Sequence, residues 1–201
     1  MLLFICNERR YPIFTLDAKT AFLLGDPLPR KLPLFVQLPR DIVQDYQLAE
    51  EGPYEVAFRL LKAAYGLSEA PLAWYLHLVE CLQKAGFRRL KADPCLFVLY
   101  LDGSEIEALT DEDLRSMPIV GLVGCHVDDL LCGGAGQRWD QAMKELTSML
   151  KFGPRKVPPV IFCGINLSQD IVAGTITQDQ THFVSDIPAV SYTHLTLPTK
   201  A

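Results

Sequence analysis

The sequence lacks the features of several common protein classes. None of its apolar runs approaches the roughly 20 residues that a membrane-spanning helix needs. The apolar start MLLFIC is too short for the core of a signal peptide, and polar residues interrupt it at 7–10. None of the six cysteines forms a C-x-x-C pair, and no cysteine–histidine set has the spacing of a zinc site. We therefore expect an intracellular protein with reduced thiols that is neither secreted nor bound in a membrane.

The sequence also lacks an excess of basic residues. It has 19 Lys and Arg against 24 Asp and Glu, a net charge of −5, whereas a basic patch is the usual sign of nucleic-acid binding. Local basic clusters remain, and each is most simply explained as solvated surface: 9–10, 30–31, 88–91 and 155–156. Hydrophobic residues make up 49% of the 201 residues, which is enough apolar material for the core of one sizeable domain.

Two segments predict helices. Residues 68–87 have a capping serine at Ser68, a proline at Pro71 in the first turn, and Gly86 at the C-terminal end. Their apolar residues recur at spacings of three and four and predict one buried stripe: Leu72, Tyr75, Leu76, Val79 and Leu82. Trp74 and His77 lie beside this stripe and are interpreted as packing residues. Residues 137–152 predict a second, amphipathic helix.

Shorter segments predict a sheet. We expect strands at 11–16, 34–38, 54–62, 95–101 and 119–127, with LLCGG completing a hairpin and two more strands in 159–170 and 173–179. Residues 19–26 predict a turn or a short helix, and the prolines of 27–53 predict loop. Residues 102–118 are acidic and predict an exposed insertion, whose carboxylates we interpret as a solvated face rather than a metal site.

Asp128 and Asp129 lie side by side between two apolar runs in GLVGCHVDDLLCGG, residues 121–134. Burying an isolated carboxylate costs on the order of several kcal/mol, and two adjacent carboxylates also repel. At the tip of a hairpin both can be exposed, and the pair is then simply a turn. The alternative is that a divalent cation compensates the charge, since magnesium is bound through one or two carboxylates. From the dipeptide alone, the turn is the simpler interpretation.

A metal site needs a further carboxylate at the end of a core strand. Asp17 directly follows the apolar run YPIFTL, whereas Asp26 in LLGDP is a weaker candidate that we interpret as a turn residue. A strand-end aspartate and a hairpin pair can share one edge of a sheet. There they could hold two magnesium ions about 4 Å apart for in-line phosphoryl transfer.

Four blocks of the sequence, in order, resemble one family. They are LDAKTAFLLGD (16–26), LKAAYGLSEAPLAWY (61–75), DPCLFVLYLDG (93–103) and HVDDLL (126–131), with a further match at FCGINLSQD (162–170). Together they resemble the reverse transcriptase of Pol polyproteins from Ty1/copia-type LTR retrotransposons, over roughly residues 11–178. The resemblance implies an α+β fold, with a polymerase palm-like antiparallel sheet backed by helices and partial fingers. It implies an RNA-directed DNA polymerase, with Mg²⁺ (two ions, or Mn²⁺ in their place) as cofactor.

The resemblance also implies site residues. Asp17, Asp128 and Asp129 match the catalytic, metal-binding aspartates. The nucleotide-binding residues would be Ala18 through its carbonyl, Phe22 as the bulky residue beside the sugar 2′ position, and Tyr65, Gly66 and Pro71. His126, Cys163 and Gly164 match the primer-positioning segments. Without the family, a core phenylalanine would be the simpler interpretation of Phe22.

The sequence departs from the family pattern at several positions. His126 stands where tyrosine is commonest, and Ser68, Glu69 and Leu72 replace the usual lysine, glutamine and arginine, which removes positive charge near the nucleotide pocket. We expect residues 1–188 to be a reverse transcriptase fragment. Residues 189–201 continue no pattern and are interpreted as a non-domain tail that resembles translated sequencing-adapter read-through.

The resemblance implies partners as well. These are an RNA or DNA template with its primer, deoxynucleotide triphosphates, and RNase H and integrase domains in the parent polyprotein, within a cytoplasmic particle or the nucleus. Two alternatives stay open. One is a catalytically inactive retroelement remnant or passive nucleic-acid-binding fragment, and the other is a two-metal nuclease of unrelated fold, which four histidines, none near Asp17, support poorly.

Overall fold

The computed structural model describes residues 1–27, 32–48, 57–101 and 118–187. The tail at 189–201, the basic pair at 30–31 and the expected acidic insertion at 102–118, except for its last residue, lie outside these residues. The helices and strands, in chain order, are α1 (Leu2–Glu8), β1 (Ile13–Asp17), α2 (Ala21–Leu24), β2 (Phe35–Gln37), α3 (Arg40–Asp45), β3 (Ala57–Arg59), α4 (Ala70–Lys84), β4 (Arg88–Arg89), β5 (Leu96–Tyr100), β6 (Ile119–His126), β7 (Asp129–Gly134), α6 (Gln137–Met149), β8 (Val160–Phe162), β9 (Ile165–Asp170), β10 (Thr175–Asp179) and α7 (Thr181–Asp186).

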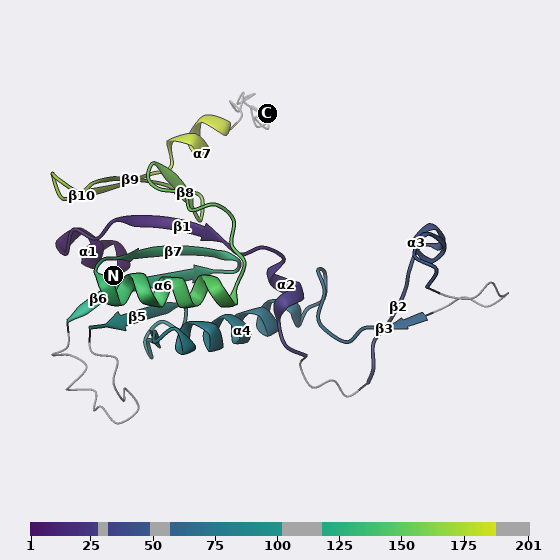
Figure 1. The fold of residues 1–201 in the computed structure, drawn as a ribbon. Coiled ribbons are helices and arrows are strands. Elements are labelled where there is room, and N and C mark those ends of the chain that lie inside the picture. The colour runs from purple at the N-terminus through teal and green to yellow at the C-terminus, as the bar shows by residue number, and fades with distance from the viewer. Residues whose placement is uncertain (28–31, 49–56, 102–117, 188–201) are drawn as a thin grey trace, which may run out of the picture.

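The centre of the molecule is a five-stranded antiparallel sheet in the order β1-β7-β6-β5-β4 (Figure 1). Helices α4 and α6 cover one face, and α1 and the small β8–β10 sheet cover the other. Both faces are therefore buried, which explains why the strands are almost continuously apolar. This is the α+β arrangement of an antiparallel sheet backed by helices that the sequence predicts.

Successive residues of each strand point to opposite faces, so neighbours along the chain enter different cores. On β1, Phe14 faces the helices while Ile13 faces α1. The core on the helical side contains the strand residues Phe14, Leu16, Phe97, Leu99, Val123, Leu130 and Cys132 with Trp74, Leu78, Leu82, Trp139, Ala142 and Leu146 of α4 and α6. The core on the other side contains Ile13, Leu96, Val98, Tyr100, Leu122 and Leu131 with Leu2, Cys6 and Leu167.

The helix predicted at 68–87 is α4, and its C-terminal stop is confirmed. Gly86 has φ 92°, its N–H donates to the carbonyl of Gln83, and the N–H of Phe87 donates to the carbonyl of Leu82. A glycine at this position closes the helix because its backbone enters the left-handed region without strain. The predicted cap is wrong, since the N-cap residue is Glu69 and no side chain caps this end.

The predicted apolar stripe of α4 is confirmed only in part. Val79 and Leu82 are buried, whereas Leu72 and Leu76 are 53% and 46% exposed. The buried face also carries Ala70, Ala73, Trp74, Leu78 and Cys81. The cause is a close backbone approach at the start of the helix. A Cβ at Gly25, just after α2, would lie 2.7–2.9 Å from atoms of Ala73 and Trp74. Only small residues fit there, so the face with alanines is turned inward.

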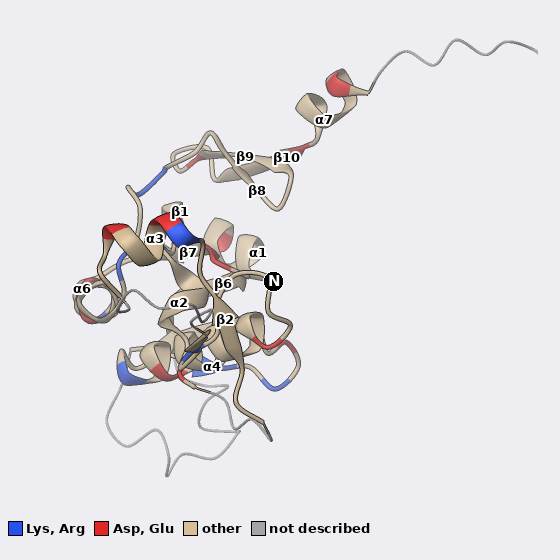
Figure 2. Ribbon diagram, turned by 90° about the vertical axis from the view of Figure 1, so that its right-hand side faces the viewer, with Lys and Arg blue, Asp and Glu red and all other residues tan. Residues whose placement is uncertain are grey.

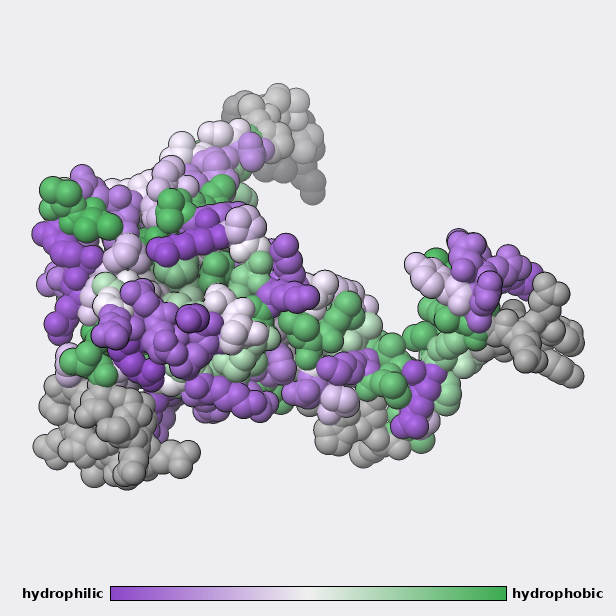
Figure 3. Space-filling view, viewed as in Figure 1, coloured by the Kyte–Doolittle hydropathy of each residue, from purple (hydrophilic) through white to green (hydrophobic). Residues whose placement is uncertain are grey.

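The strands β2 and β3 form a separate two-stranded sheet and, with α3, an arm that stands away from the main sheet (Figure 1). Both strands fall within segments where the sequence predicts strands. Hydrophobic residues are exposed along this arm (Figure 3). Phe35 and Ile42 are among its exposed apolar side chains.

Charge of both signs is spread over several elements of the ribbon (Figure 2). In the part of the chain that the structure describes, no helix is long and apolar enough to cross a membrane. All six cysteines are free, and Cys6, Cys81 and Cys132 are buried.

The closest packing of helix α6 on the sheet involves the indole ring of Trp139, beside the buried Ala142 and Leu146. Trp139 is 4% exposed and lies on Gly121 and Gly134, which are register partners on β6 and β7. A Cβ added at Gly121 would fall 2.0 Å from Cε3 of the indole, and one at Gly134 would fall 2.4 Å from Cδ2. The two glycines therefore form a seat that only a bare backbone can provide.

We predict that Gly121→Ala lowers the free energy of unfolding by about 2 kcal/mol, because the added methyl group overpacks this seat. Gly124→Ala on the same strand is the matched control, since its Cβ would meet Leu2 at 3.3 Å, a much milder approach. Denaturant unfolding of the two variants should separate them. Equal stability of the two would contradict the role assigned to the Trp139 seat.

Candidate active site

Three aspartates meet at one end of the central sheet. Asp17 is the last residue of β1, and Asp129, the first residue of β7, is its register partner. Asp128 lies in the turn just before β7, where its carbonyl accepts the N–H of Ala18 at 2.8 Å. Because directly paired residues of antiparallel strands share a face, Asp17 and Asp129 present their carboxylates on the same side of the sheet. The structure thus brings together the three residues predicted as metal ligands.

The electrostatics of this end indicate an accumulation of negative charge. Burial raises the pKa of Asp129, and the neighbouring carboxylates Asp128 and Asp17 raise it further. Lys156 and His126 act in the opposite direction and lower it. A divalent cation would relieve this repulsion, so the donor set fits a hard metal ion such as magnesium.

The spacing of the three carboxylates bears on how many ions they fit. Among the described residues, the group of three ligand atoms that all lie within 4.8 Å of one another is a different one, Asp26, His77 and Glu80. Asp17, Asp128 and Asp129 do not form such a compact group.

The turn that carries Asp128 has an unusual backbone. Val127 has φ 57°, in the left-handed region that a β-branched residue rarely enters. The indole N–H of Trp74, on α4, donates to the carbonyl of Val127 at 2.7 Å. Helix α4 therefore holds the strained residue next to the aspartate pair, as is common where a fixed site geometry is needed.

Residues 151–156 were missed as part of the site by sequence reasoning. They pair with β1 on the side opposite β7: Lys156 exchanges both backbone hydrogen bonds with Thr15, at 2.8 and 3.1 Å, and the N–H of Gly153 donates to the carbonyl of Asp17 at 2.8 Å. The guanidinium of Arg155 lies 3.7 Å from the ring centroid of Phe14. A basic segment thus borders the aspartates, although the sequence indicated only solvated charge there.

Of the predicted nucleotide-binding residues, Phe22 and Tyr65 are in ring contact, Gly66 and Pro71 follow Tyr65 in the chain, and Ala18 lies apart, directly after β1. Phe22 on α2 is half-buried, and its ring centroid is 5.1 Å from that of Tyr65 at an interplanar angle of 61°. Tyr65 is exposed, and Gly66 has φ 89°, a conformation that suits glycine. Pro71 lies in the first turn of α4, as predicted.

The predicted primer-positioning residues lie at two hairpins, Cys163 and Gly164 in the turn of one and His126 at a strand end of the other. Cys163 and Gly164 connect β8 to β9, and both have positive φ, as two-residue hairpins of type I′ require. Burial raises the pKa of Cys163 and the charge of Asp129 raises it further, which indicates that this turn lies near the aspartates. His126, at the end of β6, is the register partner of Asp129.

Comparison with known proteins identifies the family. Residues 1–196 match the family model described as "Reverse transcriptase (RNA-dependent DNA polymerase)". The chain belongs to the reverse transcriptase family. This confirms the resemblance found in the sequence motifs, and the match extends past residue 188 into the predicted tail.

Three curated proteins illustrate the relationship. The chain is 34% identical over 134 residues to the "Retrovirus-related Pol polyprotein from transposon RE2" and 35% identical over 134 residues to that of transposon RE1, both of Arabidopsis thaliana. It is 29% identical over 82 residues to that of transposon TNT 1-94 of Nicotiana tabacum. These matches cover 67%, 67% and 41% of this chain but only 8%, 8% and 6% of the relatives, so the chain spans less than a tenth of their length. No solved structure matches.

We predict that Asp129→Asn stabilises the protein in EDTA at neutral pH, by up to about 1 kcal/mol, because it removes one of three repelling carboxylates that are partly exposed and screened. The gain should shrink as the pH falls through the raised pKa of Asp129, since protonation removes the same charge from the wild type. Thermal unfolding monitored by circular dichroism measures both effects.

The matched control for this prediction is Asp140→Asn. Asp140 is an exposed carboxylate in the first turn of α6, away from other acids at the sheet end, so its loss should not stabilise the protein. Magnesium should raise the melting temperature of the wild type and of Asp140→Asn more than that of Asp129→Asn. An equal magnesium response in all three proteins would contradict a metal site at these aspartates.

Proposed function

We propose that this chain is the catalytic part of an RNA-directed DNA polymerase, which transfers deoxynucleotides to a primer 3′-hydroxyl by a two-magnesium mechanism. The observation that supports it most strongly is the register of β1 and β7, which places Asp17 opposite Asp129 with Asp128 in the adjoining turn. This arrangement occurs in a chain of the reverse transcriptase family.

Each residue of the site has a role in this proposal. Asp17 and Asp128 would hold both metal ions, with Asp129 and the carbonyl of Ala18 completing the ligand set. When bound, magnesium supplies a lowered pKa for the primer 3′-hydroxyl and stabilises the charge of the leaving pyrophosphate. The strained turn at Val127, fixed by Trp74, keeps Asp128 in place. The hairpin turn at Cys163 and Gly164 would support the primer end, with His126 beside it.

The nucleotide would lie over the Phe22–Tyr65 ring pair. The edge-to-face packing of the two rings restricts the position of Phe22. Phe22 would then exclude a 2′-hydroxyl by steric contact, while Gly66 allows close approach of the backbone and Pro71 fixes the start of α4. The natural partners in this proposal are a primed RNA or DNA template, deoxynucleotide triphosphates, and RNase H and integrase domains of a parent polyprotein. The setting would be a cytoplasmic particle or the nucleus.

Primer extension tests the proposal directly. With magnesium, an RNA template and a DNA primer, we expect extension by the wild type and by Asp140→Asn but a loss of at least about 100-fold in Asp128→Asn, since a metal ligand is removed. The melting temperature of each variant controls for folding. Activity of Asp128→Asn equal to that of Asp140→Asn would contradict the mechanism. Absence of activity in all three proteins would support the alternative, an inactive retroelement remnant.

The role of Phe22 gives a separate prediction. We expect Phe22→Ala to raise the ratio of ribonucleotide to deoxynucleotide incorporation by about tenfold, because the lost ring opens space for one hydroxyl group. Leu24→Ala on the same short helix is the control, since Leu24 packs against the core on the helical side. A ratio that stays the same in both variants would assign Phe22 to packing only.

A further inference from the structure

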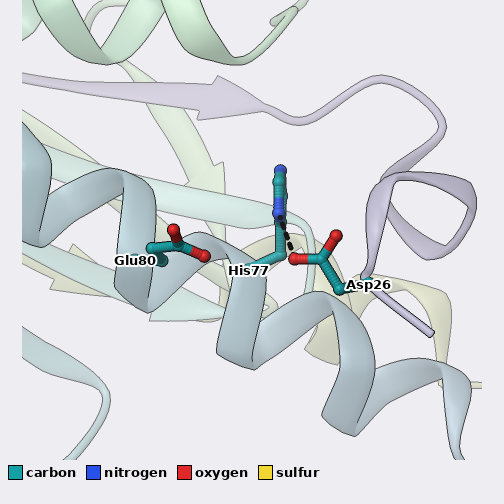
Figure 4. Close-up of side chains that lie close together, drawn as sticks. All are labelled: Asp26, His77 and Glu80. Atoms are coloured by element: carbon teal, nitrogen blue, oxygen red, sulfur yellow. Dashed lines mark hydrogen bonds and ion pairs between the residues drawn. The ribbon is translucent and has the colours of Figure 1, made fainter. Parts of the chain in front are cut away.

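A second group of metal-ligand side chains lies away from the catalytic aspartates. Asp26 follows α2, and His77 and Glu80 lie three residues apart on the outer surface of α4 (Figure 4). Figure 4 shows the two carboxylates on either side of the His77 ring. From the sequence alone, Asp26 is interpreted as a turn residue and His77 as a packing residue. Neither interpretation accounts for the convergence of three charged or titratable groups.

The geometry of this group is close to that of a metal centre. One ligand atom from each of the three residues lies within 4.8 Å of the other two. Nδ1 of His77 is 3.2 Å from Oδ2 of Asp26. Two ligands of a tetrahedral zinc ion, each bonded at about 2.0 Å, are separated by about 3.3 Å. The first two ligand atoms therefore already have the required separation.

A further contact fixes the orientation of the imidazole ring. Nε2 of His77 lies 3.8 Å from Sγ of Cys81, one turn later on α4. When Nδ1 binds a metal, Nε2 carries the hydrogen and donates it to this sulfur. Metal-bound histidines generally have such a partner on the second ring nitrogen.

The charges around the group are compatible with a bound cation. Asp26 and Glu80 together carry two negative charges, and Lys84 contacts Glu80 at 2.7 Å. Both members of that ion pair are more than half exposed. Exposed pairs of this kind contribute little to stability, so Glu80 can exchange Lys84 for a metal at small cost.

We propose that Asp26, His77 and Glu80 form a binding site for a divalent transition-metal ion of the zinc class. The imidazole ligand favours zinc, cobalt or nickel over magnesium, which prefers oxygen ligands and retains its water. Three protein ligands leave a fourth position for water. The ion would tie the segment after α2 to the middle of α4 and so fix the short helix that carries Phe22. The site is independent of the polymerase proposal.

Titration of Zn²⁺ and Co²⁺ tests the site. The full chain should carry Asp17→Asn and Asp128→Asn, so that the catalytic carboxylates do not contribute, and the buffer should contain a phosphine reductant. We expect one ion per chain by calorimetry, a visible Co²⁺ absorption band, and no displacement by millimolar magnesium. His77→Gln should weaken binding by more than tenfold, since loss of a second-shell partner alone costs about that much.

Two further variants keep the test independent of folding defects. His182→Gln on α7 is the matched control and should bind like its parent. Lys84→Ala should bind more tightly, because it removes the cation that competes for Glu80, and this gain cannot arise from misfolding. Equal affinity in His77→Gln and His182→Gln would overturn the proposal. So would the absence of Zn²⁺ binding in the parent, which would leave a simple His77–Asp26 ion pair.

Discussion

The pairing of β1 with β7 is the constraint on which the rest of the structure depends. The register of five residue pairs places Phe14 and Leu16 in one core and Ile13 in the other, and it ends with Asp17 opposite Asp129. A shift of this register by one residue would turn every side chain of β1 to the opposite face of the sheet and would bury a carboxylate. The apolar pattern therefore fixes the position of the site as well as the fold. The chemistry of the carboxylates and the burial of their neighbours are parts of the same arrangement.

Much of the fold follows from local sequence. The long apolar runs predict the central strands, and Gly86 predicts the end of α4, because these signals act within a few residues. The first part of the buried face of α4, with Ala70 and Ala73, could not be predicted in this way. It depends on the close approach of Gly25 to Ala73, two residues 48 positions apart in the chain, where the absence of a side chain decides the packing. Helices α1, α3 and α7 are short, with too few turns for a periodic signal.

The candidate site likewise contains some residues that the sequence could predict and others that it could not. The aspartates could be found because the family motifs carry them. The basic segment 151–156 could not, since it contains Gly153 and Pro154 and makes only isolated bridges with β1, so no strand-like alternation marks it. The Asp26–His77 contact joins a loop to a helix and likewise has no sequence signature. At the sheet end, the burial and the like-charge repulsion that raise the pKa of Asp129 oppose stability, and so does the strained φ of Val127, as expected where geometry serves a ligand.

The pairing of residues 151–156 with β1 also affects whether the molecule can associate with other copies of itself. Without this segment, β1 would be an outer strand with free backbone groups, and such strands recruit others into aggregates. Gly153 and Pro154 cover it without offering a regular strand of their own, because proline has no N–H to donate. The opposite margin of the sheet is β4, which has only two residues, Arg88 and Arg89. Neither edge of the sheet therefore offers a long free strand to another molecule. Cutting the chain just after α6 would remove residues 151–156 and leave β1, the longer edge strand, free to pair with another copy.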